Sequence, residues 1–343
     1  MIYLIILMLE KTQLDKYDTK KMYQVYDRWP EIAKNAYDNS HNQIDFDGIN
    51  HIVFAGMGGS GTIGDIFAAI LSKTNIHVTI VKGYRLPKTV DVKTLVISTS
   101  VSGNTKETLT ILESSIKINC KKIAFSSGGE MEKICMENNV EFRKIEKNHS
   151  PRASLVNFLY SILFILKPLL PIKEDDIHES IKEMITLRDL ISSENLNEKN
   201  TAINLAKWIT GVSLIYHPFG LQAAAVRFKN SLQENSKIHG ISEDVIEACH
   251  NGIVAWENNS KIIPILIQGA NDDEKTKERW KIIKEYFNLK SIEYKEIYSV
   301  EGAILSKLIN LIYFFDFTSI YKAILSKTDP SPVKSIDFIK SRS

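Results

Sequence analysis

A short apolar run that ends in a cluster of glycines places the strongest constraint on how this chain folds. Residues 51–61 (HIVFAGMGGSG) join strand-forming side chains to four glycines and a serine. A second run, residues 95–105 (LVISTSVSGNT), ends in hydroxyl side chains instead. Helical patterns follow the two loops, at 61–72 and 105–117. This succession predicts strands with donor-rich loops at their carboxyl ends, which is how an α/β sheet holds a phosphate.

The alternation of strands and helices extends along the whole chain. Strands are expected at 52–55, 76–81, 94–97, 122–125, 212–216, 262–268 and 292–297. Helices are expected at 61–72, 105–117, 130–138, 154–170, 174–200, 222–233, 274–287 and 303–325. Nearly all the strand runs are apolar, as in parallel sheets that are covered on both faces. The sequence therefore predicts an α/β protein with two similar lobes, each a doubly wound parallel sheet.

Size, charge and cysteine content narrow the class of protein further. A chain of 343 residues with 44% hydrophobic and 24% charged residues suits two soluble globular domains. The net charge of +2 provides no basic field for nucleic acid. The three cysteines, Cys120, Cys135 and Cys249, are odd in number and form no CxxC pair. We therefore expect a reducing, cytoplasmic location, with neither a disulfide framework nor a thiolate metal site.

The first nine residues, MIYLIILML, are apolar and then give way to charged residues. They include no basic region and no small-residue cleavage site, and they are too short to span a bilayer. We expect no signal peptide and no membrane partner. An added strand, a contact with a partner and a start codon assigned too early remain open.

The glycine loop matches a dinucleotide fingerprint, but its surroundings do not. Residues 56–61 satisfy G-x-G-x-x-G, whereas the position for the ribose-binding acid falls near Lys82, where there is none. A P-loop is excluded as well, because no Lys-Ser/Thr pair follows the glycines. Glycines let backbone N–H groups approach a ligand, and the helix N-terminus favours an anion. The second loop adds the hydroxyls of Ser100, Ser102 and Thr105, of which we expect one to cap its helix.

Taken in order, the motifs resemble a known family. GMGGSG followed by S-x-S-G-N-T resembles the SIS (sugar isomerase) domain. PRASL (151–155), LQENSK (232–237), HNGIVAWE (250–257) and DPSPVKSIDFIK (329–340) extend the likeness to the bifunctional phosphoglucose/phosphomannose isomerases. The resemblance covers the chain from about residue 54 to the C-terminus.

The resemblance implies two SIS domains and a homodimer whose active site is completed by the partner subunit. It implies interconversion of glucose 6-phosphate, mannose 6-phosphate and fructose 6-phosphate, with no metal and no other cofactor. The expected segments are an N-terminal extension (1–45), a first SIS domain (46–172), a helical connector (173–200), a second SIS domain (201–326) and a C-terminal segment folding over the site (327–343).

The resemblance also assigns roles to single residues. Substrate phosphate falls to the loop residues Gly58, Gly59, Ser60, Ser100, Ser102 and Thr105. The catalytic base falls to Glu234, at the end of the helix expected at 222–233, and ring opening to His250 and Lys340, with Lys334 as the substitute for Lys340. Stabilisation of the developing charge falls to Arg152, which follows Pro151 at the exit of an expected strand.

The chemistry suits these residue types. Aldose–ketose isomerisation through a cis-enediolate needs one carboxylate base, and a guanidinium can hold the enediolate oxygens. Histidine titrates near neutrality and can exchange protons with the sugar ring. A solvated glutamate, a surface ion pair and a structural histidine are the ordinary alternatives for Glu234, Arg152 and His250. His149, His217 and His239 are expected to be structural.

Three other functions remain open at this stage. A single-substrate phosphoglucose isomerase would carry the same motifs. A non-catalytic sugar-phosphate sensor would need the phosphate loops without Glu234 and His250, and no basic helix suited to a DNA groove is evident. A zinc-dependent phosphomannose isomerase is disfavoured because the sequence has no clustered histidines.

Overall fold

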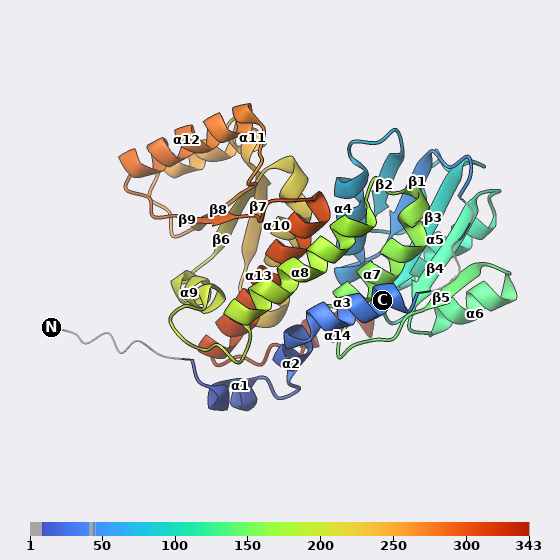
Figure 1. The fold of residues 1–343 in the computed structure, drawn as a ribbon, viewed down its shortest axis with the longest axis horizontal. Coiled ribbons are helices and arrows are strands. Elements are labelled where there is room, and N and C mark those ends of the chain that lie inside the picture. The colour runs from blue at the N-terminus through green and yellow to red at the C-terminus, as the bar shows by residue number, and fades with distance from the viewer. Residues whose placement is uncertain (1–8, 41–43, 45, 343) are drawn as a thin grey trace. The chain divides into compact units, whose positions relative to one another are not determined.

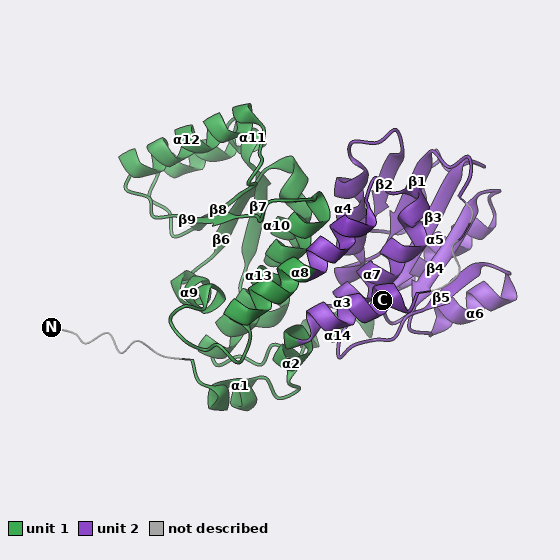
Figure 2. Cartoon of the chain, viewed as in Figure 1, with its two compact units in different colours: residues 1–27, 182–343 green, residues 28–181 purple. Residues whose placement is uncertain are grey.

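The computed structural model describes residues 9–40, 44 and 46–342. Residues 1–8, which carry most of the apolar N-terminal segment, lie outside the described residues, so the expectation for that segment stays a prediction. The chain divides into two compact units, each with its own sheet (Figure 2). Unit 1 comprises Met1–Asp27 and Lys182–Ser343, and unit 2 comprises Arg28–Ile181.

Unit 2 is built on a parallel sheet. Its described strands, in spatial order, are β2 (His77–Val81), β1 (His51–Ala55), β3 (Thr94–Ser100), β4 (Lys121–Ser126) and β5 (Glu141–Lys144). Its helices are α3 (Trp29–Asp38), α4 (Gly59–Leu71), α5 (Lys106–Ile116), α6 (Glu130–Glu137), α7 (Leu155–Leu166) and the first part of α8 (Glu174–Ile191), with a 3-10 turn, η1, at Lys167–Leu169.

Helices cover both faces of this sheet because alternate strand residues point to opposite sides. Val53 of β1 packs in one cluster with Ile111 of α5. On the other face, the ring of Phe54 stacks on that of Phe67 in α4, with centroids 5.2 Å apart. Burial of all of β1 and β3 explains the apolar runs at 52–55 and 95–97.

Unit 1 contains a second parallel sheet. Its described strands, in spatial order, are β7 (Gly240–Asp244), β6 (Ser213–His217), β8 (Ile263–Gln268) and β9 (Lys295–Tyr298). Its helices and helical turns are α1 (Lys11–Tyr17), α2 (Met22–Asp27), α9 (Thr201–Trp208), η2 (Phe219–Leu221), α10 (Gln222–Ser231), η3 (Leu232–Ser236), α11 (Val245–Ala248), η4 (Gly252–Glu257), α12 (Glu274–Leu289), α13 (Ile304–Leu325) and α14 (Lys334–Lys340) (Figure 1).

Both faces of the second sheet are also covered. Tyr216 and Leu266 pack with Trp280 and Phe287 of α12 on one side. α10 packs against β6 and β7, and the ring of its Phe228 stacks on that of Phe315 in α13, with centroids 4.2 Å apart. The predicted fold, two parallel sheets with helices on both faces, is thereby confirmed.

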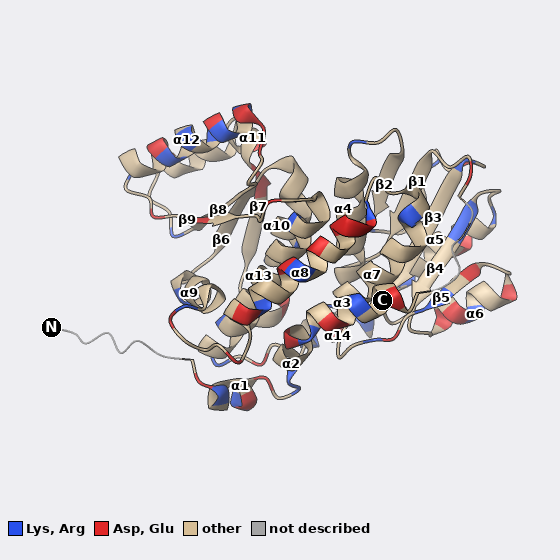
Figure 3. Ribbon diagram, viewed as in Figure 1, with Lys and Arg blue, Asp and Glu red and all other residues tan. Residues whose placement is uncertain are grey.

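The two longest helices of unit 1 differ in polarity. α12 carries charges of both signs along its length (Figure 3). α13 alone among the described helices is long and apolar enough to cross a bilayer by length and composition, and 89% of its most apolar window is buried within the protein. Its side chains form part of the interior of unit 1.

Three local predictions need correction. The expected helix at 174–200 ends at Ile191, whose carbonyl accepts hydrogen bonds from Asn200 Nδ2 (3.0 Å) and Tyr321 Oη (2.6 Å). Strands β5 and β7 were not expected, because both are short and only partly buried and so lack an apolar pattern. The helix at 222–233 continues beyond α10 into a wider, π-helical turn, η3.

Candidate functional site

The first predicted phosphate loop joins β1 to α4. Gly58 occupies the N-cap position with φ of 55°, a backbone conformation that favours glycine, and a Cβ at this position would meet no atom within 4 Å. No described side chain caps the N-terminus of α4. Ser60, in the first turn, is 7% exposed. The loop therefore presents an uncapped helix end beside open space, an arrangement that suits an anion.

The second loop joins β3 to α5 and is organised by its own hydroxyls. Ser100 Oγ lies 2.9 Å from Thr105 Oγ1 and accepts a hydrogen bond from the Gly103 amide at 3.2 Å. Ser102 is exposed, and its Oγ accepts from the Asn104 amide at 3.3 Å. Thr105 holds the N-cap position of α5 but makes no capping hydrogen bond through its side chain, so the capping expectation is wrong. The hydroxyls of Ser100, Ser102 and Thr105 thus form hydrogen bonds within the loop and do not cap α5.

A third loop, which the sequence did not point to, supports the second one. Gly103 has φ of 69°, and a Cβ there would lie 1.7 Å from the carbonyl oxygen of Gly128, after β4. Ser127 Oγ donates to the carbonyl of Val101 at 2.6 Å, and the Glu130 amide donates to Asn104 Oδ1 at 2.9 Å. The hydroxyl loop is thus fixed in place by the loop between β4 and α6.

The two phosphate loops follow neighbouring strands at the point where the strand order reverses. β1 pairs with β3 on one side and with β2 on the other, and the chain leaves β1 and β3 at the same edge of the sheet. Open α/β sheets bind ligands at such switch points. At the end of β2, Lys82 Nζ pairs with Asp65 Oδ2 of α4 at 2.6 Å. A paired lysine there disfavours the dinucleotide alternative, which needs an acid for the ribose hydroxyls.

Arg152 also belongs to unit 2 and lies in a turn that several hydrogen bonds hold. Its expected place at a strand exit is wrong, because β5 ends at Lys144 and the turn directly precedes α7. Ser154 Oγ donates to the carbonyl of Asn148 at 3.0 Å, and Trp29 Nε1 donates to that of Ala153 at 3.0 Å. Arg152 is 5% exposed. A buried guanidinium on a fixed turn suits recognition of negative charge.

Glu234 belongs to unit 1 and lies in the π-helical turn η3. The side chain is half-buried, while Asn235 and Ser236 beside it are buried. Lys237 ends the turn in the left-handed conformation, with φ of 57°, and its Nζ donates to the carbonyl of Glu234 at 2.5 Å. π-turns are rare in helices and occur frequently at functional sites.

Strand β7 separates Glu234 from His250 along the chain. Glu234 precedes the amino end of β7. His250 follows α11, which begins directly after the carboxyl end of β7. The strand has five residues, which corresponds to about 16 Å at the rise of an extended chain. His250 is exposed, and its amide donates to the carbonyl of Glu247 at 2.9 Å.

Lys340 and Lys334 end and begin helix α14, and both are exposed. The C-terminal segment therefore includes a short helix. Before the helix, the carbonyl of Pro330 accepts a hydrogen bond from Lys237 Nζ at 3.3 Å. The segment that carries the lysines is thereby joined to the turn that carries Glu234.

His217, which is expected to be a structural histidine, is a buried residue of β6. It ends β6, is 3% exposed, and its Nδ1 lies 3.2 Å from the carbonyl oxygen of Pro218. Burial lowers its pKa from the ordinary histidine value, which keeps the ring neutral near pH 7.

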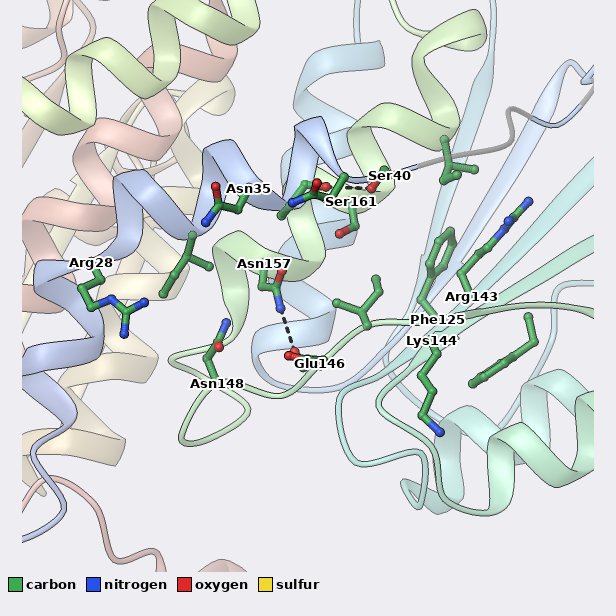
Figure 4. A pocket seen from close by; sticks show the side chains of 16 residues that line it. Arg28, Asn35, Ser40, Phe125, Arg143, Lys144, Glu146, Asn148, Asn157 and Ser161 are labelled. Carbon is green, nitrogen blue, oxygen red and sulfur yellow. Dashed lines mark hydrogen bonds between the residues drawn. The ribbon is translucent and has the colours of Figure 1, made fainter.

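A separate polar cavity of about 740 Å³ lies in unit 2 (Figure 4). It is lined mainly by residues in and next to α3, β5 and α7, among them Arg28, Lys144 and Asn157. Asn157 Nδ2 donates to the carbonyl of Glu146 at 2.7 Å. None of the predicted site residues lines it. The phosphate loops and this cavity are therefore distinct features of the unit.

Comparison with known proteins identifies relatives along nearly the whole chain. Residues 198–342 match the model of the bacterial phospho-glucose isomerase C-terminal SIS domain. A bifunctional phosphoglucose/phosphomannose isomerase from Caldicellulosiruptor bescii is 31% identical over 94% of this chain and 98% of its own. A second such isomerase, from Aquifex aeolicus, is 30% identical over 91% of this chain and 93% of its own. A D-glucosamine-6-phosphate 4-epimerase from Sulfolobus acidocaldarius is 28% identical over 74% and 80%.

Solved structures agree on the fold. A hypothetical protein from Thermus thermophilus superposes with a TM-score of 0.72, at 14% identity over 96% of this chain and 92% of its own. Glucosamine-6-phosphate deaminase from Thermotoga maritima superposes with a TM-score of 0.67, at 16% identity over 92% of this chain and 96% of its own. Because the two isomerase relatives match more than nine-tenths of this chain at 30% identity or more, the chain belongs to the family of bifunctional phosphoglucose/phosphomannose isomerases.

Proposed function

We propose that this protein interconverts glucose 6-phosphate and mannose 6-phosphate with fructose 6-phosphate. The observation that carries the proposal is the pair of donor-rich loops after β1 and β3, at the switch point of the first sheet. Family membership supplies the reaction class. We further propose that the two SIS domains are residues 46–172 and 201–326, joined by 173–200, and that the enzyme works in the cytoplasm. The described cysteines are all free thiols, in keeping with that compartment.

In this proposal the two loops bind the 6-phosphate and leave the other end of the sugar free to react. The groups that bind the phosphate are the backbone N–H groups at Gly58 and Gly59 and the hydroxyls of Ser60, Ser100, Ser102 and Thr105. Hydroxyl and amide donors hold a phosphate without a fixed counter-charge, so the product can leave. The hydrogen bond between Ser100 and Thr105 supports this assignment, because it orients two of the hydroxyls before substrate arrives.

Proton transfer is assigned to Glu234. Its carboxylate removes the C2 proton of the open-chain aldose and returns it to C1, while the hydroxyl proton moves from O2 to O1. The intermediate is a cis-enediolate, whose negative charge the guanidinium of Arg152 stabilises. C2 is planar in this intermediate. Return of the proton to either face of C2 then gives glucose 6-phosphate or mannose 6-phosphate.

Ring opening is assigned to His250 and Lys340. One group donates a proton to the ring oxygen while the other accepts the proton of the C1 hydroxyl. We propose that the enzyme is a homodimer in which His250 serves the active site of the partner subunit. The position of His250 and Glu234 beyond opposite ends of β7 supports this arrangement.

An assay that starts from fructose 6-phosphate and measures both aldose products tests the proposal. Formation of glucose 6-phosphate and mannose 6-phosphate is the expected result. Formation of glucose 6-phosphate alone would indicate a single-substrate isomerase, and binding without turnover would indicate a sugar-phosphate sensor. Either outcome would overturn the proposal as stated.

The likeness to a D-glucosamine-6-phosphate 4-epimerase favours a second candidate function. A C4 epimerase would convert glucosamine 6-phosphate to its C4 epimer and would form neither glucose 6-phosphate nor mannose 6-phosphate from fructose 6-phosphate. Incubation with each substrate, followed by chromatographic separation of the products, distinguishes the two activities. We expect turnover of fructose 6-phosphate and none of glucosamine 6-phosphate.

A further inference from the structure

The turn that carries Glu234 departs from ordinary helical geometry. α10 runs to Ser231 as an α-helix and then widens into the π-helical turn η3 over Leu232–Ser236. In a π-turn the hydrogen bonds join residues five apart instead of four, so Glu234 leaves the helix in a different direction from the one an α-turn would give it. Such a turn persists only where its surroundings favour it.

One residue of the neighbouring helix α13 binds the turn twice. Asn235 Nδ2 donates to Ser319 Oγ at 2.8 Å, and Ser236 Oγ donates to the carbonyl of Ser319 at 2.6 Å. Ser319 Oγ in turn donates to the carbonyl of Asp316 at 2.7 Å. Ser319, Asn235 and Ser236 are all buried. The two residues after Glu234 are therefore fixed to a single point of α13.

A second attachment lies on α10, before the turn begins. Arg227 Nη2 pairs with Asp316 Oδ2 at 2.7 Å, and Ser231 Oγ donates to Asp316 Oδ1 at 2.5 Å. The Arg227 and Asp316 side chains are 3% and 0% exposed. Breaking a buried, hydrogen-bonded pair of this kind is costly, so it holds α10 firmly against α13.

Arg227 also lies within the electrostatic field of the proposed base. Burial lowers the pKa of the Arg227 guanidinium, but the charges of Asp316, Tyr26 and Glu234 raise it, and the net pKa is above its usual value. The buried cation therefore interacts favourably with the carboxylate of Glu234 as well as with Asp316.

We propose that Ser319 and Asp316 of α13 are positioning residues, which hold the π-turn so that Glu234 faces the substrate. The inference rests on the proposed function of Glu234 as the base. Neither residue is assigned a contact with the sugar. They act through Asn235, Ser236, Ser231 and Arg227, which lie on either side of Glu234 along the chain.

The test replaces Ser319 by alanine, which removes the acceptor of Asn235 and leaves the backbone in place. Misplacement of a reacting group by about 1 Å can cost on the order of 100-fold in rate. We expect Ser319→Ala to lower kcat for fructose 6-phosphate about 10- to 100-fold with little change in KM, because the phosphate loops are untouched. Thr318→Val is the control, since this neighbouring buried hydroxyl donates to the carbonyl of Phe314 and not to the turn.

A second experiment separates positioning from a general loss of structure. Ser319→Ala is combined with Glu234→Gln, and we expect no further loss of kcat beyond that of Glu234→Gln alone, because residues that act as a unit are not additive. If Ser319→Ala does not fold, Ser231→Ala gives the same test through the other attachment. A kcat equal to that of Thr318→Val, or an additive loss in the double variant, would overturn the positioning role.

The two proposals fail in different ways. If Glu234→Gln retains full turnover, the base is wrongly assigned, and the positioning role falls with it. If Glu234→Gln is inactive while Ser319→Ala is fully active, the base stands and only the positioning role is refuted.

Discussion

Ser100 and Thr105 hydrogen-bond to each other across the loop between β3 and α5, with their hydroxyl oxygens 2.9 Å apart. The contact joins the last residue of the strand to the N-cap residue of the helix. Two hydroxyls in contact can turn together toward an acceptor that enters the loop. This relationship leads to a prediction about substrate affinity.

We expect Ser100→Ala to raise KM for fructose 6-phosphate about 10- to 100-fold, since a hydrogen bond to a charged group contributes about 1.5–3 kcal/mol. Steady-state kinetics measure the effect. Ser114→Ala is the control, because the Ser114 hydroxyl donates to the carbonyl of Thr110 within α5. An unchanged KM in Ser100→Ala would remove this residue from the phosphate site.

Replacement of the proposed base separates chemistry from binding. We expect Glu234→Gln to lower kcat by at least about 100-fold, since general base catalysis contributes about 10²–10⁴-fold. Calorimetric titration with fructose 6-phosphate is expected to give a dissociation constant close to that of the unchanged protein. Glu278→Gln, an exposed position on α12, is the matched control. Full turnover by Glu234→Gln would exclude it as the base.

Mixed dimers test whether His250 acts in the partner's active site. We expect Glu234→Gln and His250→Ala to be inactive separately and active when the two chains are co-expressed, because one site of each mixed dimer then has both residues. The activity of the purified mixed dimer is the measurement. Persistent inactivity, in a dimer shown by mass to contain both chains, would place both residues in a site formed by one chain.

The buried histidine of β6 makes stability depend on pH. Burial lowers the pKa of His217, so the unfolded chain binds a proton more readily than the folded protein as the pH falls below about 6.5, the ordinary histidine value. The contribution of the neutral ring to stability is therefore lost with falling pH. We expect the drop in Tm between pH 8 and pH 5.5 to be smaller for His217→Asn than for the unchanged protein, as measured by scanning calorimetry. An equal drop would exclude His217 as a source of this dependence.

The sequence predicted the parts of the fold whose cause is local. β1 and β3 were recognisable because burial on both faces makes residues 52–55 and 95–97 apolar. β3 continues beyond the expected end at 97, because the hydroxyl residues 98–100 still belong to the strand. β5 and β7 escaped prediction because they are half-exposed, and β5 (EFRK) consists mostly of charged residues. Their place in the sheets depends on the neighbouring strands β4 and β6.

The surroundings of the proposed site residues were harder to predict than the motifs that carry them. Resemblance identified Glu234, but the π-turn around it depends on Ser319, which lies far along the chain. Arg152 was identified by its motif, whereas its turn is held by Trp29. Contacts between distant segments leave no periodic signal in the sequence, so only the folded structure reveals them.

The close approach of Gly103 to Gly128 has a consequence for the proposed binding of a phosphate at the hydroxyl loop. Because the two backbones already touch, the hydroxyl loop has its shape before any anion arrives. Little conformational entropy is then lost on binding, so weak individual donors suffice for useful affinity. In the proposed function, a preformed loop of this kind presents the same donors to the phosphate group of substrate and product alike.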